Sequence, residues 1–299
     1  MNEKICYFTC FWLGDRRKMY PEYEQDRLYY LKQQIKALQT YNHSLNKIIF
    51  TFNITPEQYH HFSEIFRITP KYINGVEVEI IFRKNQGISF GAFSDAFSKH
   101  KTQYDYYIFT EDDHIFCVDN FDTYLVNKHN SYPDCGFIGM VNREPASWFN
   151  YKKHAGVGAG LASSSNLLKL YNFSGGKLPH PYKTLEDFEG DSKKTYKHFE
   201  DGQMDFTFNF LKLGLNLYDV RDDYKIIVDA FNNDNADVCI YFNSNPTLFY
   251  KPLKIINKNY SWFACDDIEF RKNYTLLTPE EALYCYDNKL GYDEYRPYE

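Results

Sequence analysis

The sequence predicts an α/β protein in which a mostly parallel central sheet is flanked by helices and followed by a less regular C-terminal extension. Two observations predict this fold class. Short apolar segments alternate with segments of helical periodicity up to about residue 220, and this alternation is typical of parallel strands joined by crossover helices. One mid-chain apolar segment runs directly into three acidic residues, and in parallel sheets ligands bind beyond the carboxyl ends of the strands.

Strands are predicted where a short apolar or β-branched segment is bounded by turn residues. These segments are 5–12, 47–53, 76–82, 106–110, 135–141 and 215–220. Residues 155–170 are rich in small side chains and predict a strand or a loop followed by a helix.

Helices are predicted where apolar residues recur every three to four positions. These segments are 23–41, 56–66, the loop-to-helix segment 87–99, and 205–213. In the first of them, one face carries the apolar residues Leu28, Leu31, Ile35 and Leu38. Residues 173–199 contain many Gly, Pro, Lys and Asp residues and predict a long loop or flap. Long loops of this kind are often functional.

Composition and charge narrow the classes of function. The 299 residues suit one large domain with a substantial core. A net charge of −6 without a basic block argues against non-specific nucleic-acid binding. No apolar segment reaches the roughly 18 residues of a membrane helix, and the N-terminus lacks a signal-peptide pattern. We therefore expect a cytoplasmic protein, with peripheral membrane association left open.

The acidic residues Glu111, Asp112 and Asp113 directly follow the predicted strand 106–110. Adjacent carboxylates at the end of a buried strand repel one another, and a divalent cation would remove that repulsion. Magnesium and manganese prefer hard oxygen ligands, and they often bind through one or two carboxylates plus substrate phosphates. The alternative is a solvated acidic turn. His114 is either a further ligand or a local structural histidine.

This acidic segment resembles the Asp-x-Asp motif of GT-A glycosyltransferases, in the Glu-Asp-Asp form that some of them use. The resemblance implies a Rossmann-like GT-A domain over residues 1–220, which binds a nucleotide sugar and carries out catalysis. It also implies that Asp113 binds Mn²⁺ or Mg²⁺ directly, while Glu111 and Asp112 contact the nucleotide ribose or metal-bound water. Residues 221–299 match no part of the family, and we expect them to pack on the same domain.

Other pieces of the sequence resemble family 2 glycosyltransferases in particular. Asn85 and Gly87 match the Asn-x-Gly element that precedes the metal motif, although the next residues depart from the family's usual Ala-Arg-Asn. An ordinary loop-to-helix turn would also explain the glycine. The loop after the first strand holds base and ribose in such enzymes, and here it contains Arg16, which could equally be solvated. Asn53 stands where family members often carry an Asp that touches the base.

The segment 198–205 resembles the family's Glu-Asp segment at the start of a helix. That segment supplies the catalytic base in inverting members, where a carboxylate takes the proton of the acceptor hydroxyl. Asp201 is the residue that we favour as this base, with Glu200 and Asp205 as alternatives. Acidic residues also favour a first helical turn because they cap the helix and interact with its dipole, which is the competing explanation.

The sequence therefore predicts transfer of a sugar from a nucleoside-diphosphate sugar, assumed to carry UDP, to a hydroxyl of a glycan or glycoconjugate. Inversion is expected, although retaining enzymes share this fold and motif. Two rivals remain. A sugar nucleotidyltransferase would also use a metal and an α/β sheet, but residues 14–17 are a poor version of its phosphate loop. A non-catalytic carbohydrate-binding protein is compatible with the 19% aromatic content.

Overall fold

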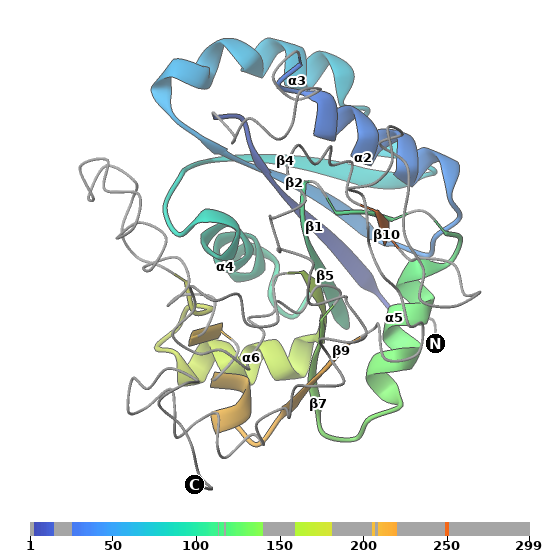
Figure 1. Ribbon diagram of the computed structural model, residues 1–299, viewed down its shortest axis with the longest axis vertical. Helices are drawn as coiled ribbons and strands as arrows, with labels where there is room; N and C mark the ends of the chain where they lie inside the picture. The colour runs from blue at the N-terminus through green and yellow to red at the C-terminus, as the bar shows by residue number, and fades with distance from the viewer. Residues whose placement is uncertain are drawn as a thin grey trace, which may run out of the picture.

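The computed structural model describes residues 3–14, 26–112, 114–116, 118–139, 159–180, 205–206, 209–219 and 249–250. Within these residues, a central sheet lies between two layers of helices (Figure 1).

Eight strands form the central sheet in the order β3-β4-β2-β1-β5-β8-β7-β9. Their bounds are β1 (Ile5–Trp12), β2 (Lys47–Ile54), β3 (Tyr72–Ile73), β4 (Val76–Lys84), β5 (Tyr106–Glu111), β7 (Cys135–Gly139), β8 (Gly160–Ser163) and β9 (Asn216–Asp219). Strands β4, β2, β1 and β5 are parallel neighbours, and so are β7 and β9. Only β3 and β8 run antiparallel to the strands beside them. The predicted class, a mostly parallel sheet flanked by helices, is confirmed.

Helices cover both faces of this sheet. Their bounds are α2 (Tyr29–Thr40), α3 (Phe62–Ile68), α4 (Ile88–His100), α5 (Phe121–Asn130) and α6 (Ser164–Phe173), with a 3-10 helix η1 (Pro56–His61) before α3. Figure 1 shows α4 and α6 on one side of the sheet and α2, α3 and α5 on the other.

Strand β1 shows why the sheet is buried on both faces. Its residues Tyr7 and Phe11 belong to the core cluster beneath α2 and α5, whereas Phe8 and Cys10 belong to the cluster beneath α4 and α6. All four are buried. Because successive side chains of a strand point to opposite faces, a strand covered on both sides needs a continuous apolar run rather than an alternating one.

Most predicted elements are present, with some changes of type. The predicted helix 56–66 is a 3-10 turn, η1, followed by α3. The ambiguous segment 155–170 contains β8 and then α6, whose first turn is capped by Ser163. Four short elements were not predicted: α5, β3, β6 (Ile115–Phe116) and β10 (Phe249–Tyr250).

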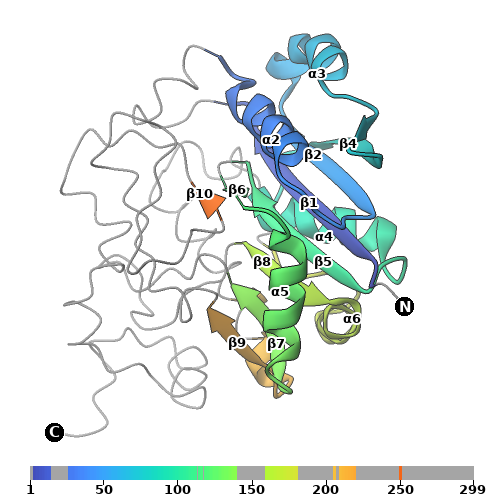
Figure 2. The same ribbon diagram turned by 90° about the vertical axis from the view of Figure 1, so that its right-hand side faces the viewer.

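The last of these elements pairs residues 249–250 with a segment near the acidic residues. Strand β10 pairs antiparallel with β6, in the register Phe249 opposite Phe116 and Tyr250 opposite Ile115. Figure 2 shows the two strands side by side. Because β6 begins four residues after Glu111, the late segment 249–250 is hydrogen-bonded to the backbone that follows the acidic residues.

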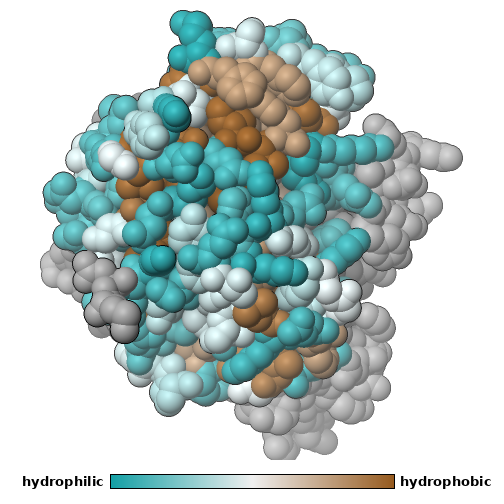
Figure 3. All heavy atoms as spheres, turned by 180° about the vertical axis from the view of Figure 1, so that it is seen from behind, coloured by the Kyte–Doolittle hydropathy of each residue, from teal (hydrophilic) through white to brown (hydrophobic). Residues whose placement is uncertain are grey.

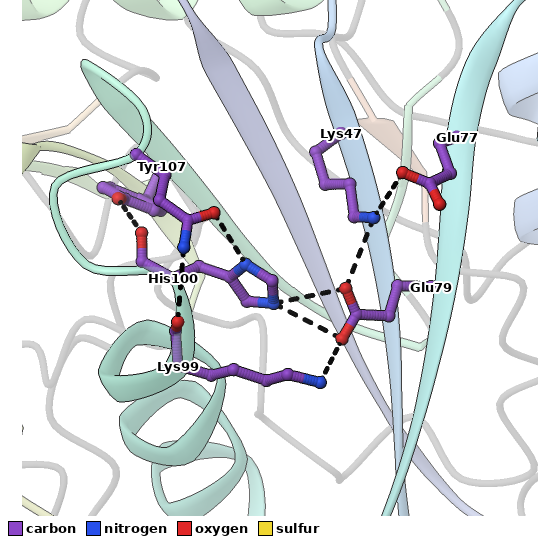
Figure 4. A network of polar contacts seen from close by, with 7 residues as sticks. Lys47, Glu77, Glu79, Lys99, His100 and Tyr107 are labelled. Atoms are coloured by element: carbon purple, nitrogen blue, oxygen red, sulfur yellow. Dashed lines mark hydrogen bonds and ion pairs between the residues drawn. The ribbon is translucent and has the colours of Figure 1, made fainter.

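A polar network lies at the opposite, amino-terminal edge of the sheet (Figure 4). Glu79 accepts from Lys99 and lies 3.3 Å from both Lys47 Nζ and His100 Nε2. Lys47 Nζ also lies 2.8 Å from Glu77. Although its partial burial raises the pKa of Glu79, the hydrogen bond and positive charge of Lys99 and the charge of His100 lower it overall. This network joins three elements: the first residue of β2, the first half of β4 and the last turn of α4.

Two of the exposed aromatic side chains among the described residues lie on η1 and α3. Phe66 is 60% exposed and Tyr59 is 55% exposed. Figure 3 shows a hydrophobic patch at the top of the molecule, where Figure 1 places α3. Among the helices of the described part of the chain, none combines the length and the apolar character that crossing a bilayer requires.

Candidate active site

The carboxyl ends of four parallel strands bring the predicted site residues to one edge of the sheet. Trp12 at the end of β1 lies opposite Asn53 of β2, and Asn53 in turn lies opposite Arg83 of β4. On the other side of β1, Cys10 lies opposite Glu111 of β5. Residues as far apart in sequence as Cys10 and Glu111 therefore share one edge, which is where ligands bind in parallel sheets.

Glu111, the last residue of β5, is held by the first turn of α4. Its Oε1 accepts a hydrogen bond from Ser89 Oγ at 2.9 Å, and its Oε2 lies 3.9 Å from His114 Nδ1. Its side chain is 26% exposed. The N-terminus of a helix favours negative charge, so the start of α4 both orients this carboxylate and stabilises it.

Asp112 follows Glu111 and is nearly buried, with 4% exposure. Its Oδ2 accepts a hydrogen bond from the backbone N–H of Trp12 at 3.2 Å. The carboxylate that follows β5 therefore accepts from the last backbone N–H of the neighbouring strand, which fixes Asp112 against the end of β1.

The main chain after β5 also accepts hydrogen bonds from a buried glutamine. Gln34 on α2 donates through Nε2 to the carbonyls of Asp112, at 3.0 Å, and His114, at 2.7 Å. Its Oε1 accepts from the hydroxyl of Tyr7 at 2.8 Å. Burial raises the pKa of Tyr7 to about 12, so the phenol keeps its proton and remains the donor. We call Tyr7 and Gln34 the loop clamp.

The Asn-x-Gly element forms the turn between β4 and α4. Gly87 adopts φ +76°, a left-handed conformation that glycine tolerates without steric cost. Asn85 Oδ1 is buried and has no hydrogen-bond partner among the described residues. Gly91, in the first turn of α4, has no room for a side chain, because an added Cβ would lie 2.0 Å from the carbonyl oxygen of Gln86.

Asn53 is 1% exposed, and its amide group is used inside the protein. Its Nδ2 donates to the carbonyl of Ile88 at 3.0 Å and to Cys10 Sγ at 3.2 Å, while its Oδ1 accepts from Arg83 Nη1. The expected contact between Asn53 and a nucleotide base stays a prediction.

Asp205 lies beside the same edge through its neighbour Phe206. The Phe206 ring packs on Phe90, in the first turn of α4, with ring centroids 5.2 Å apart, and on Phe137 of β7 at 5.6 Å. Asp205 is partly buried. Of the three acidic residues proposed as base, it is the one that the structure describes, and it lies one residue from a side chain that contacts α4.

Four predicted site residues lie outside the described residues, namely Arg16, Asp113, Glu200 and Asp201. Conversely, the sequence interpretation assigned no role to Ser89, Gln34 or Arg83. Gln34 had a recognisable signal, since it interrupts the apolar face formed by Leu31, Ile35 and Leu38. A polar residue on such a face needs a buried partner.

A divalent cation fits the donor chemistry of this edge in part. Glu111 and Asp112 supply the hard carboxylate oxygens that Mg²⁺ and Mn²⁺ prefer. Within the described ranges, no three His, Cys, Asp or Glu side chains gather closely enough to hold a metal ion. Asp113, which the sequence predicts as the direct metal ligand, lies outside the described residues.

Comparison with known proteins finds solved structures of low similarity to this chain. The sequence matches no protein-family model and no curated protein. S. aureus TarS is 9% identical over 96% of this chain and 43% of TarS, with a TM-score of 0.42. Residues 1–349 of S. aureus TarS in complex with UDP are 10% identical over 96% of this chain and 71% of that chain, with a TM-score of 0.40.

A third neighbour is CMP:2-keto-3-deoxy-manno-octonic acid synthetase complexed with CTP. It is 10% identical over 72% of this chain and 88% of that chain, with a TM-score of 0.38. This chain thus spans less than half the length of full TarS. The sheet order and the helices on both faces are those of the Rossmann-like α/β fold that the sequence predicts, and the similarities at these scores assign no activity.

Proposed function

We propose that this chain is a metal-dependent glycosyltransferase of the GT-A type that moves a sugar from a nucleoside-diphosphate sugar to a hydroxyl of a glycan or glycoconjugate, with inversion. One observation carries the proposal. The acidic loop after β5 is held against α4 through Ser89 and Glu111, and against β1 through Asp112, at the carboxyl edge of a parallel sheet. Glu111 and Asp112 of the acidic motif, and Asn85 and Gly87 of the Asn-x-Gly element, lie at this edge.

The donor would bind across this edge, with residues 1–220 forming the catalytic domain and 221–299 packing on it. Asn85 offers a buried amide oxygen, and the turn at Gly87 brings backbone close to a ligand. UDP is the nucleotide that we assume. Mn²⁺ or Mg²⁺, with Asp113 as its direct ligand, would neutralise the charge that develops on the leaving diphosphate.

The transfer itself needs one protein base. The acceptor oxygen forms a bond to the anomeric carbon, the bond from that carbon to the phosphate oxygen breaks, and the nucleoside diphosphate leaves with the electron pair. The acceptor proton passes to a carboxylate, for which we propose Asp201, with Glu200 and Asp205 as the alternatives. The contact of Phe206 with Phe90 in α4 supports Asp205 as one of these alternatives.

Thermal unfolding with nucleoside diphosphates, with and without Mn²⁺, tests the proposal. A ligand that binds only the native state raises the melting temperature. We expect a Mn²⁺-dependent rise with one nucleoside diphosphate, and we expect it to be lost in Asp113→Ala but kept in Glu57→Gln, which changes an exposed carboxylate on η1.

Three results would contradict the proposal. A nucleotide response that is unchanged in Asp113→Ala would remove the metal assignment. Pyrophosphate release from a nucleoside triphosphate plus a sugar phosphate would indicate a nucleotidyltransferase instead. Glycan binding without any nucleotide response would indicate a carbohydrate-binding protein.

A further inference from the structure

The turn that leads into α4 contains a strained residue directly after the Asn-x-Gly element. Ile88 adopts φ +49°, and β-branched residues rarely adopt positive φ because the side chain clashes with the backbone. Such a conformation persists only where surrounding contacts impose it. The contacts that impose it here identify residues that act on the site without lying in the acidic motif.

Asn53 provides the first of these contacts. Its Nδ2 donates to the carbonyl of Ile88 at 3.0 Å, and its Oδ1 accepts from Arg83 Nη1. A guanidinium has only donors, so the amide oxygen of Asn53 must face Arg83 and its nitrogen must face Ile88. Arg83 therefore determines the orientation in which Asn53 holds the strained residue.

Arg83 also holds the turn itself. Its Nη2 donates to the carbonyl of Gln86 at 2.8 Å, and its Nε lies 2.7 Å from Asp95 Oδ2 on α4. The Arg83 side chain is 10% exposed, whereas that of Asp95 is 57% exposed. Gly91 makes this arrangement possible, since a Cβ there would lie 3.0 Å from Arg83 Nη2. The two inner arms of the guanidinium thus join β2, β4 and the turn.

We infer that Arg83 and Asn53 are positioning residues that impose the conformation of residues 85–88, and that Asn53 acts through this turn and not by reading a nucleotide base. Both polar groups of the Asn53 amide are engaged within the protein, so its side chain is committed to the turn. The inference about the turn stands on the contacts alone. Its consequence for nucleotide affinity rests on the proposed function.

Three variants separate the contacts. In Asn53→Asp, the carboxylate still accepts from Arg83 but cannot donate to the carbonyl of Ile88. In Arg83→Lys the charge remains, but a single ammonium cannot reproduce the planar fork. Asp95→Asn is the matched control, because it removes only the negative charge of the exposed side chain that faces Arg83 Nε, and exposed ion pairs contribute little.

The first measurement is hydrogen–deuterium exchange of the ligand-free, full-length chain, followed in peptides that cover residues 84–91. The backbone N–H of Gly91 bonds to the carbonyl of Gly87 at 2.8 Å and reports on this turn. We expect at least tenfold faster exchange in Asn53→Asp and Arg83→Lys, and less than twofold change in Asp95→Asn, with exchange in β1 unchanged in all three. Exchange at wild-type rates in both test variants would overturn the inference.

The second measurement is binding of UDP with Mn²⁺. We expect at least tenfold weaker binding in both test variants, with the ranking among UDP, CDP and GDP unchanged. If Asn53 instead reads the base, Asn53→Asp will keep the exchange pattern and alter that ranking, which would overturn the inference. If wild-type protein binds no nucleoside diphosphate, the proposed function fails. The exchange data alone then decide whether Arg83 and Asn53 impose the conformation of the turn. Should Asn53→Asp not fold, Arg83→Lys decides the outcome by the same two readouts.

Discussion

The loop clamp leads to a prediction whose size follows from the structure. Replacing Gln34 by Leu leaves the carbonyls of Asp112 and His114 without the donor that each has at 3.0 and 2.7 Å. Gln34 is 1% exposed, so water cannot readily replace the lost donors. An unsatisfied buried polar group costs about 1–3 kcal/mol. Two carbonyls lose their donor, and the added apolar burial offsets roughly 1 kcal/mol, so we expect the unfolding free energy to fall by about 3 kcal/mol.

Tyr7→Phe is the matched change on the other side of the clamp. It removes one donated hydrogen bond, to Gln34 Oε1 at 2.8 Å, and leaves both carbonyl contacts in place. We expect a loss of about 1 kcal/mol. Since both changes remove the same contact, the double variant should lose less than the sum of the two single losses.

Urea unfolding followed by tryptophan fluorescence and circular dichroism measures all three variants. The same proteins should bind Mn²⁺ with UDP more weakly in the order wild type, Tyr7→Phe, Gln34→Leu, because the clamp positions the backbone on either side of residue 113. If Gln34→Leu unfolds within 0.5 kcal/mol of wild type, the reasoning from unsatisfied carbonyls is wrong. Additive losses in the double variant would show that Tyr7 does not act through Gln34.

Two further predictions concern the site and the response to pH. Ser89→Ala removes the 2.9 Å hydrogen bond to Glu111. Since a hydrogen bond to a charged group contributes about 1.5–3 kcal/mol and this carboxylate is partly exposed, we expect about tenfold weaker UDP–Mn²⁺ binding by calorimetry, and unchanged affinity would contradict a role for Ser89. Burial lowers the pKa of His129, and it lowers that of His43 against the opposing charge of Asp122. In both cases the unfolded chain binds the proton more readily than the folded chain. The unfolding free energy should therefore fall as the pH drops below about 6.5, by at most ~1.4 kcal/mol per pH unit for each histidine. Unfolding free energies between pH 7.5 and 5.5 measure this loss, and His129→Leu should reduce the slope.

The elements that sequence predicted well are those whose pattern is decided locally. The apolar run of β1 and the face formed by Leu31, Ile35 and Leu38 in α2 each specify an element without reference to distant residues. The left-handed turn at Gly87 was likewise indicated by a glycine before a helical pattern. Strand β8 was ambiguous because Gly160 and Ala162 suit close packing in any element. Its antiparallel direction follows from pairing with β5 and β7, which no local pattern reports.

In the candidate site, too, the sequence indicated the local motifs but not the distant residues that contact them. Its acidic and Asn-x-Gly motifs lie in contiguous segments, so the sequence interpretation found Glu111, Asp112, Asn85 and Gly87. Two of the residues that hold the acidic motif are distant in sequence, because Ser89 is 22 positions from Glu111 and Gln34 is 80 positions from His114. A single sequence contains no record of such pairs. The role of Asn53 shows the consequence, since position alone suggested a base contact and its partners suggest a support for the turn.

These supports share a physical property that bears on how the site would bind a ligand. Tyr7, Gln34 and Asn53 are polar side chains inside the core, each at most 1% exposed. In a low-dielectric interior a polar group that loses its partner costs far more than at the surface, so alternative loop conformations that break these contacts are strongly disfavoured. The backbone at Asp112 and His114 and the turn before α4 should therefore hold one conformation before any nucleotide arrives. Ligand binding would then not incur the free-energy cost of ordering these backbone groups.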